Sequence, residues 1–402
     1  MRTIRLTGQG NQIRAQALGL LIAAMMVTVV LAPATAQRVP GVTADTITLG
    51  MPVAMSGPVS TIGIPLARGA EAYFKWVNDR GGIHGRRVRL IIEDDRYIPS
   101  ETLAAARKLV ERDEVFALFR PLGTPTGAAI IDYTVERAVP VVAPASGSSL
   151  WIQPFKRNYF SIQPIYFFEG RLMAKYALET MGAKRIAVFY QNDSYGKEGR
   201  DAFVQMLTIN GVRPVADIPY EPGETSFTAH AVRLREANPD LVFVYAIVVP
   251  AASLLREAAR LGLRTRWLMT YVLADPVMFR LAGDQMEGVR AGAWLLDPDG
   301  DDPAVVAYRS RLKAAFPAEV PGGYSISSDA AAALMVEGLR RAGRDLTRDR
   351  FIEAMEGIRN FNAGGLTPPF GYSRTDHSGI RQLAIVEGRR GKWVTVKEFF
   401  GE

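Results

Sequence analysis

Short apolar segments alternate with amphipathic segments of helical period along most of this sequence. One helix-like segment, residues 65–78, carries Leu66, Ala70, Phe74 and Val77 on one face. The segments typical of buried strands are 46–51, 88–95, 115–119, 139–143, 185–190, 241–245 and 266–270. Continuous apolar strands separated by helices are typical of parallel sheets that are covered on both faces. The pattern therefore predicts an α/β fold in which each parallel sheet is flanked by helices.

The N-terminal segment has the three parts of a secretory signal peptide. Three arginines lie within the first 14 residues, and an apolar run at 17–32 is followed by small residues up to Ala36. The run is barely long enough to span a bilayer, which argues against a retained anchor. We therefore expect a signal peptide over residues 1–36, cleaved after Ala36, and export to the periplasm.

Charge and cysteine content narrow the classes of function. Beyond residue 36 the chain has 45 basic and 41 acidic residues, and they are scattered, so we expect no nucleic-acid partner. The chain has no cysteine, which excludes disulfides, thiol catalysis, zinc–thiolate sites and a lipid-modified N-terminus. Stability must then come from a large core, and the length suggests two domains. A free periplasmic protein, monomeric and without a cofactor, is expected.

Open parallel sheets bind ligands beyond the carboxyl ends of their strands, so the segments that follow the strands are the first candidates for a site. The first strand leads into residues 54–63, where Ser56 and Ile62 could contact a ligand. The fourth leads into a loop that contains Ser146, Gly147 and Ser148 and ends in Trp151. Hydroxyls and backbone amides can orient a ligand while an aromatic ring buries it. An ordinary serine-rich turn explains the same residues equally well.

The third strand ends in Arg120, followed by Gly123 and Thr124. An arginine at the end of a buried strand is costly unless it is paired, so Arg120 should face a carboxylate of the protein or of a ligand. Gly123 and Thr124 precede a helix, whose N-terminal N–H groups could receive a carboxylate. Helix capping alone also accounts for the threonine.

The second half of the chain offers less polar strand ends. Tyr195 opens a helix after the strand at 185–190, and Val249 and Tyr271 follow two further strands. Hydroxyl-rich ends in the first half and apolar ends in the second suit a molecule with one polar and one apolar end.

Catalytic patterns are missing from the sequence. His84, His230 and His377 are not spaced as metal ligands, and no Gly-x-Ser-x-Gly elbow or phosphate-binding glycine motif occurs. The acidic cluster Glu93–Asp95 is more typical of a hinge, a cap or an ion pair. We therefore expect a binding protein with no metal and not an enzyme.

Five separated motifs resemble a known family. They are residues 54–58, 78–85, 93–95, 143–147 and 192–196, and they occur in this order over nearly all of the chain. In this respect the sequence is similar to type I periplasmic binding proteins of the leucine/isoleucine/valine-binding kind. The resemblance implies two Rossmann-like lobes, joined by three crossovers, that close like a hinge on a small molecule in the cleft between them.

The resemblance also implies a division of the chain and a role. Lobe one would comprise residues 44–162 plus 288–362, and lobe two residues 163–287 plus 363–402. The protein would be the substrate-binding component of a branched-chain-amino-acid-type ABC transporter and would deliver its ligand to the permease. A sensor that presents the same closed form to a chemoreceptor or regulator is the alternative.

Ligand contacts carry over from the family only in part. The loop at 146–148 and the position near Gly123–Thr124 match family positions that receive the ligand carboxylate, and Tyr195 matches a tyrosine that contacts ligand. At Tyr271 and Val272, however, the family's amino-acid binders carry an acid for the ligand ammonium, and its aromatic near Ile62 is also absent. A small amino acid, an aromatic or aliphatic carboxylate, or an amide therefore all stay open. Glu169 or Asp193 could replace the missing acid.

Overall fold

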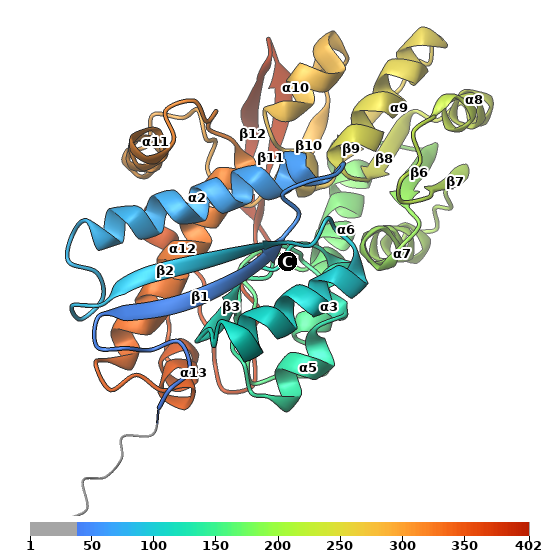
Figure 1. The fold of residues 1–402 in the computed structure, drawn as a ribbon. Coiled ribbons are helices and arrows are strands. Elements are labelled where there is room, and N and C mark those ends of the chain that lie inside the picture. Colours follow the sequence, from blue (N-terminus) through green and yellow to red (C-terminus); the bar gives the residue numbers. More distant parts are fainter. Residues whose placement is uncertain (1–37, 402) are drawn as a thin grey trace, which may run out of the picture. The chain divides into compact units, whose positions relative to one another are not determined.

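Two β-sheets organise residues 38–401, the part of the chain that the computed structural model describes (Figure 1). The predicted signal peptide, residues 1–36, lies outside the described residues. Each sheet is flanked by helices, so the α/β prediction is confirmed.

The first sheet is parallel throughout and has the strand order β2-β1-β3-β4-β5. Strand β1, which pairs with β2 and β3, is buried over most of its length, as its apolar sequence predicts. The strands are β1 (Thr46–Val53), β2 (Arg87–Asp94), β3 (Ala117–Phe119), β4 (Val141–Val142) and β5 (Tyr159–Phe160).

Helices from two distant parts of the chain pack around this sheet. Helices α2 and α12 lie side by side, although more than 200 residues separate them in sequence (Figure 1). The helices of this lobe are α2 (Ser60–Asn78), α3 (Pro99–Arg107), α4 (Thr124–Ala128), α5 (Ile131–Glu136), α11 (Pro303–Ala315), α12 (Gly323–Ala342) and α13 (Arg348–Glu356). A π-helical turn, Lys108–Arg112, extends α3.

The second sheet has the order β12-β11-β10-β9-β8-β6-β7. Strands β6 to β10 are parallel, whereas β11 and β12 form an antiparallel hairpin that pairs with β10, so this sheet is not purely parallel as expected. The strands are β6 (Ile186–Gln191), β7 (Ala216–Tyr220), β8 (Leu241–Tyr245), β9 (Arg266–Met269), β10 (Arg290–Ala293), β11 (Leu383–Arg389) and β12 (Lys392–Phe400). Its helices are α6 (Tyr166–Lys175), α7 (Ser194–Ile209), α8 (Thr228–Ala237), α9 (Val248–Arg260) and α10 (Val277–Ala282).

The chain crosses between the lobes three times. It leaves the first sheet after β5, returns after β10 to the helices that pack on α2, and crosses again before β11. Strand β10 belongs to the second sheet although residues 288–362 were expected in lobe one. We therefore propose lobe one as residues 44–162 plus about 294–362, and lobe two as residues 163–293 plus 363–402.

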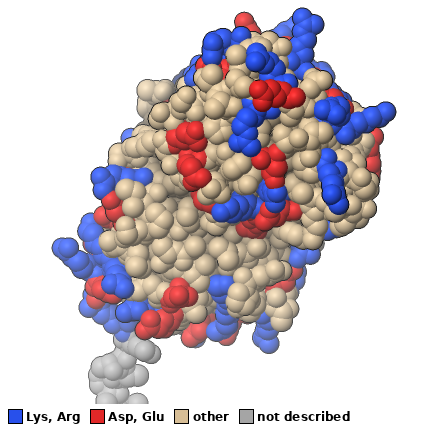
Figure 2. Space-filling view, turned by 90° about the vertical axis from the view of Figure 1, so that its right-hand side faces the viewer, with Lys and Arg blue, Asp and Glu red and all other residues tan. Residues whose placement is uncertain are grey.

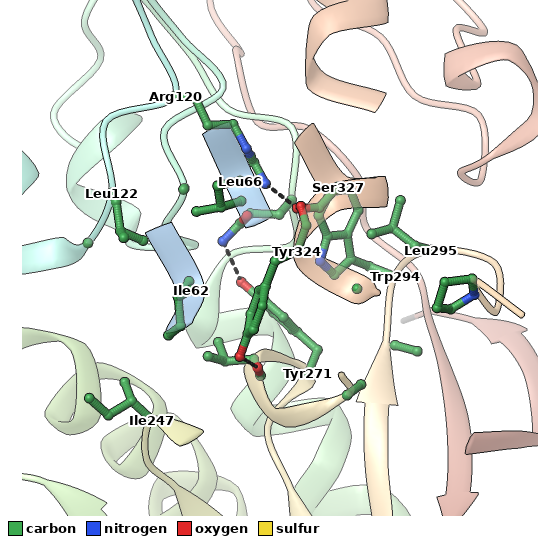
Figure 3. A pocket seen from close by; sticks show the side chains of 18 of the residues that line it. Ile62, Leu66, Arg120, Leu122, Ile247, Tyr271, Trp294, Leu295, Tyr324 and Ser327 are labelled. Atoms are coloured by element: carbon green, nitrogen blue, oxygen red, sulfur yellow. Dashed lines mark hydrogen bonds between the residues drawn. The ribbon is translucent and has the colours of Figure 1, made fainter. Parts of the chain in front are cut away.

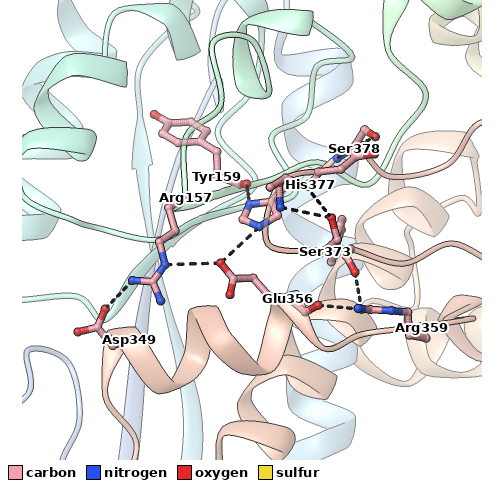
Figure 4. Close-up of polar contacts among 11 residues, drawn as sticks. Arg157, Tyr159, Asp349, Glu356, Arg359, Ser373, His377 and Ser378 are labelled. Carbon is pink, nitrogen blue, oxygen red and sulfur yellow. Dashed lines mark hydrogen bonds and ion pairs between the residues drawn. The ribbon is translucent and has the colours of Figure 1, made fainter.

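Two of the crossover segments are hydrogen-bonded to each other. The Ser161 N–H donates to the His377 carbonyl at 3.0 Å, and the Ile380 N–H donates to the Ile162 carbonyl at 2.8 Å. His377 is fully buried, its ring stacks on Phe160, and its Nδ1 lies 2.8 Å from the Tyr159 carbonyl (Figure 4). These contacts tie the third crossover to the end of β5.

Charged side chains of both signs are interspersed on the face drawn in Figure 2, and no extended field of one sign covers it. Within residues 38–401, no helix combines the length and the apolar character needed to cross a membrane.

Candidate functional site

A cavity lies at the carboxyl ends of strands from both sheets. It contains about 990 Å³ of space free of protein atoms, part of it continuous with solvent. The lining is largely apolar and aromatic and includes Val59, Ile62, Leu66, Tyr97, Leu122, Tyr166, Tyr195, Ile247, Tyr271, Val272, Trp294, Leu295 and Tyr324 (Figure 3). Polar groups in the lining include Arg120, Thr124, Gln163, Asp297 and Ser327.

Six of the twelve residues proposed from the sequence line this cavity: Ile62, Arg120, Gly123, Thr124, Tyr195 and Tyr271. The other six, which are Ser56, Ser146, Gly147, Ser148, Trp151 and Val249, are not part of the lining.

Arg120 lies at the end of β3 with 1% of its surface exposed and reaches into the cavity (Figure 3). Its Nη2 donates to Ser327 Oγ at 2.6 Å, its Nε to Ser328 Oγ at 3.1 Å, and its Nη1 to the Ala143 carbonyl at 3.2 Å. All three acceptors are neutral, and no carboxylate within residues 38–401 forms an ion pair with it. Burial lowers the pKa of Arg120 to about 9, so the guanidinium is still charged at pH 7.

The backbone at the ends of β3 and β4 is strained. Arg120 has φ 56° and Ala143 has φ 52°, in the left-handed region that residues with a side chain rarely adopt. Backbone strain of this kind costs about 1–3 kcal/mol and tends to be kept at functional sites. Here the two strained residues hydrogen-bond to each other, which holds the guanidinium at the cavity wall.

The polar groups of the loop at 146–148 form hydrogen bonds within the protein. Ser146 Oγ lies 2.7 Å from Thr124 Oγ1, and the Ser148 N–H donates back to Ser146 Oγ at 3.2 Å. With its amide oriented so that the oxygen faces the loop, Gln163 accepts from the Gly147 N–H at 2.9 Å and from the Ser146 N–H at 3.2 Å. The donors that the family resemblance reserves for a ligand carboxylate thus already have acceptors.

Gly147 is needed here for space. A Cβ at this position would lie 2.2 Å from the Tyr271 hydroxyl oxygen and 2.4 Å from the Pro164 carbonyl oxygen. Any larger residue would push apart the loop and the segment that carries Tyr271.

The remaining predicted residues outside the lining have structural partners. The Ser148 hydroxyl donates to Glu198 on α7 at 2.7 Å, and the Trp151 indole Nε1 donates to the Ser146 carbonyl at 2.9 Å. Ser56 is exposed, and its hydroxyl donates to Asp94 at 2.6 Å. Val249 is 40% exposed on the outside of α9, and Ile247, two residues earlier, lines the cavity instead.

Three tyrosines present rings to the cavity while their hydroxyls bond to backbone carbonyls. Tyr195 donates to the Ala246 carbonyl at 3.0 Å, Tyr271 to the Pro164 carbonyl at 2.9 Å, and Tyr324 to the Val272 carbonyl at 2.8 Å. Burial holds the pKa of all three hydroxyls well above the usual range. The surface they offer to a ligand is therefore mainly that of their rings.

The two acids suggested as replacements for the missing one do not line the cavity. Glu169 is fully buried and accepts from the Tyr271 N–H at 2.6 Å, from Tyr245 at 2.7 Å and from Thr270 at 3.1 Å. Burial raises its pKa to about 7. Asp193 caps α7 by accepting from the Tyr195 and Gly196 N–H groups.

Several residues of the cavity lining are not predicted from the sequence. Tyr97 follows the end of β2, where the strand-end rule applies, whereas Trp294 follows β10, a strand that the apolar pattern does not predict. Tyr324 and Ser327 lie on the first two turns of α12, and Gln163 lies in a crossover. No periodicity or motif in the sequence points to these three. Within residues 38–401, no cluster of three acidic or histidine side chains is arranged to hold a metal ion.

Comparison with known proteins agrees with this architecture. Residues 46–392 match the family described as periplasmic binding protein. The Leu/Ile/Val-binding protein homolog 3 of Brucella melitensis is 26% identical over 301 residues, which is 74% of this chain and 79% of that protein. The Leu/Ile/Val-binding protein of Escherichia coli is 26% identical over 246 residues, 61% of this chain and 67% of that protein.

Solved structures show the same fold. A substrate-binding periplasmic protein from Ralstonia solanacearum superposes with a TM-score of 0.80 at 26% identity, covering 87% of this chain and 99% of that one. A branched-chain amino acid ABC transporter protein from Thermus thermophilus, solved with bound valine, gives a TM-score of 0.83 at 22% identity, covering 90% and 98%. The family contains binding proteins that act outside the cytoplasm, and it is not an enzyme family. The chain belongs to the periplasmic binding protein family.

Proposed function

We propose that this protein captures a small amino acid or carboxylate-like ligand in the cavity between its lobes and closes on it by a hinge motion. The observation that carries the proposal is the cavity itself, because residues from both lobes and from a crossover contribute to one lining. A molecule held there would contact both lobes at once. A ligand can shift an open–closed equilibrium only by binding the closed form more tightly, and simultaneous contact with two lobes supplies that difference.

The closed protein would then deliver its ligand to an ABC permease at the inner membrane. We propose that the protein works as a monomer, free in the periplasm after removal of residues 1–36. The absence of cysteine leaves no site for a lipid anchor, which supports a soluble carrier.

Ligand-dependent closure tests this function directly. The protein would be stripped of bound molecules by unfolding and refolding and screened by thermal shift against amino acids, aliphatic and aromatic carboxylates and amides. A ligand present at one hundred times its dissociation constant adds about 2.7 kcal/mol to the free energy of unfolding. The best ligand should also reduce the radius of gyration in small-angle X-ray scattering. If no member of the panel changes either quantity, the proposal is wrong.

A further inference from the structure

Arg120 is a buried cation whose partners in the protein are all neutral. An arginine side chain has five N–H donors, and the three bonds to Ser327, Ser328 and the Ala143 carbonyl leave part of this capacity unused. A buried charge is costly unless an opposite charge accompanies it, and none does so within the described residues. Arg120 is part of the cavity lining, and Figure 3 shows its guanidinium beside Ser327 at the cavity wall.

The loop at 146–148 does not compete for an anion. Its two N–H groups face the Gln163 amide oxygen, and Ser148 and Ser149 together donate to both oxygens of Glu198, at 2.7 Å each. A protein carboxylate and a protein amide therefore take the donors of this loop. Arg120 is the strongest anion-binding group left in the lining.

An α-amino acid would need a second charged partner close to the first, since its ammonium and carboxylate are attached to the same carbon. An acid that binds this ammonium, while Arg120 binds the carboxylate, would have to line the same cavity. Among residues 38–401, Asp297 is the one acid in the lining. It accepts from the Asp299 N–H at 3.0 Å, and Lys392 and Arg309 lie near enough to favour its charged form, so its charge already has cationic company in the protein.

The rest of the lining suits an apolar body. Tyr195, Tyr271 and Tyr324 direct their hydroxyls to backbone carbonyls and offer ring surface. Ile62, Leu66 and Trp294 add further apolar surface, and Figure 3 shows them around the same space as the two labelled tyrosines. A ligand hydroxyl or ammonium in this part of the cavity would lose its water without gaining a partner.

We infer that the ligand is a monocarboxylate with an apolar aliphatic or aromatic body and no charged amine, and that Arg120, not the loop at 146–148, binds its carboxylate. This inference rests on the proposed function, because it assumes that the cavity holds the transported solute. Ser327 and Ser328 position the guanidinium, and the tyrosine rings enclose the body of the ligand.

Matched ligands test the inference without changing the protein. The pairs are 4-methylpentanoate with leucine and 3-phenylpropanoate with phenylalanine, which differ only by the α-amine, together with the carboxamide of each acid. Binding would be measured by isothermal titration calorimetry on stripped, refolded protein. Each acid should bind about 10- to 100-fold more tightly than its amino acid and its amide, because a charge-assisted pair to a buried arginine is lost or an ammonium is left unpaired.

A variant separates the role of Arg120 from general effects on folding. Arg120→Gln should lose about 10- to 100-fold in affinity for the acids and keep its affinity for the amides within about threefold. Arg348→Gln is the matched control, because Arg348 is also partly buried and bonds to the carbonyls of Val115 and Phe116, outside the cavity lining. If Arg120→Gln does not fold, the comparison of acids, amino acids and amides in the unchanged protein still tests the inference.

The outcomes distinguish this inference from the proposed function. Leucine or phenylalanine binding as tightly as its deaminated counterpart, or an amide binding as tightly as its acid, would overturn the inference and leave the solute-binding function intact. If none of the six compounds binds, the inference is wrong, and the wider thermal-shift panel decides the solute-binding function separately.

Discussion

Glu198 on α7 accepts two hydrogen bonds from the loop that follows β4, one from the Ser148 hydroxyl and one from the Ser149 N–H, both at 2.7 Å. Helix α7 packs beside the second sheet and the loop belongs to the first lobe, so this pair of bonds joins the two lobes. Burial raises the pKa of Glu198 above its usual value, although both bonds favour its charged form. The contact is available only while the two lobes are close together.

Replacing Glu198 should weaken ligand binding without touching the cavity. We expect Glu198→Gln to raise the dissociation constant by about 3- to 10-fold, since bonds to a charged group contribute about 1.5–3 kcal/mol and this group is partly exposed. Titration calorimetry measures the change. Glu257→Gln on α9 is the control, because its carboxylate bonds to Thr228 and Arg260 within one lobe. Equal affinity in both variants would contradict a role for this contact in closure.

Replacing Ser146 with alanine should lower the stability of the protein and leave its ligand affinity nearly unchanged. Ser146→Ala removes the partner of Thr124 and the acceptor of the Ser148 N–H in a fully buried position, which should cost about 1–3 kcal/mol in the free energy of unfolding. Ligand affinity should change little, because Ser146 is not part of the lining. Urea unfolding and calorimetry on the same samples separate these effects, and a large loss of affinity at unchanged stability would show that the loop contacts ligand.

Tyr195→Ala should lower both stability and affinity. The ring packs edge-on against Tyr166 at 5.1 Å between centroids and at a tilt against Tyr245 at 5.1 Å, and deleting a buried aromatic side chain costs about 3–5 kcal/mol. Tyr195→Phe keeps the ring and loses only the bond to the Ala246 carbonyl, so it should keep most of the affinity. If the phenylalanine variant loses as much affinity as the alanine variant, the hydroxyl and not the ring is what the ligand needs.

Glu169 should make stability depend on pH. Its pKa is raised from 4.5 to about 7 in the folded protein, so its contribution is fully present below pH 4.5 and is lost as the pH rises through 7. Glu169→Gln stays neutral and keeps the hydrogen-bonding shape. The free energy of unfolding of the native protein relative to this variant should therefore fall between pH 5 and pH 8, with a slope of at most about 1.4 kcal/mol per pH unit. Parallel pH profiles for the two proteins would contradict this.

His377 has the opposite dependence. Burial lowers its pKa below 6.5, although Glu356 lies 3.8 Å from its Nε2 and Asp376 also favours the charged form (Figure 4). Arg157 Nε lies 3.5 Å from Glu356 Oε1, so the same carboxylate oxygen faces both Arg157 and His377. The stability that His377 contributes is therefore present above pH 6.5 and is lost as the pH falls below it.

His377→Asn tests this dependence, because an amide can still donate to the Tyr159 carbonyl. The difference in the free energy of unfolding between the native protein and this variant should shrink from pH 7.5 to pH 5.5, measured by urea denaturation. His84→Asn, at an exposed histidine, controls for the loss of an imidazole. A difference that stays constant over this range would contradict the expected dependence.

Long apolar strands could be located from the sequence, and short or amphipathic ones could not. Strands β6, β8 and β9 lie where the apolar runs predict them, because they are interior strands of a sheet and β6 and β8 are buried almost throughout. Strand β5 has two residues, and in the edge strand β12 only Trp393 is buried while the other residues are exposed or half-buried, so neither gives a continuous signal. The sequence predicts that the first helix of this lobe starts at Pro65. Helix α2 instead begins at Ser60, five residues earlier, and Pro65 lies inside it.

For the site, residues at strand ends could be predicted from the sequence, and residues whose role depends on distant partners could not. The strand-end rule finds Arg120 and Tyr271 because strand ends meet at one edge of a sheet. It cannot tell which polar groups are already satisfied, and this is why Ser148, whose partner Glu198 lies 50 residues away, was expected to contact ligand. Ser327 on α12, 207 residues from Arg120, completes the cavity wall only after the chain has returned from the second lobe.

The order of segments along the chain has a consequence for how the protein can be divided. Helices α12 and α13 complete the first lobe only after β10 has joined the second, and the hairpin β11–β12 completes the second lobe with the final residues of the chain. No single cut therefore yields two finished halves, and a chain that stops before Leu383 lacks an entire edge of its second sheet. Unfolding either lobe removes support from chain segments that belong to the other, so cooperativity between the lobes is built into the connectivity itself.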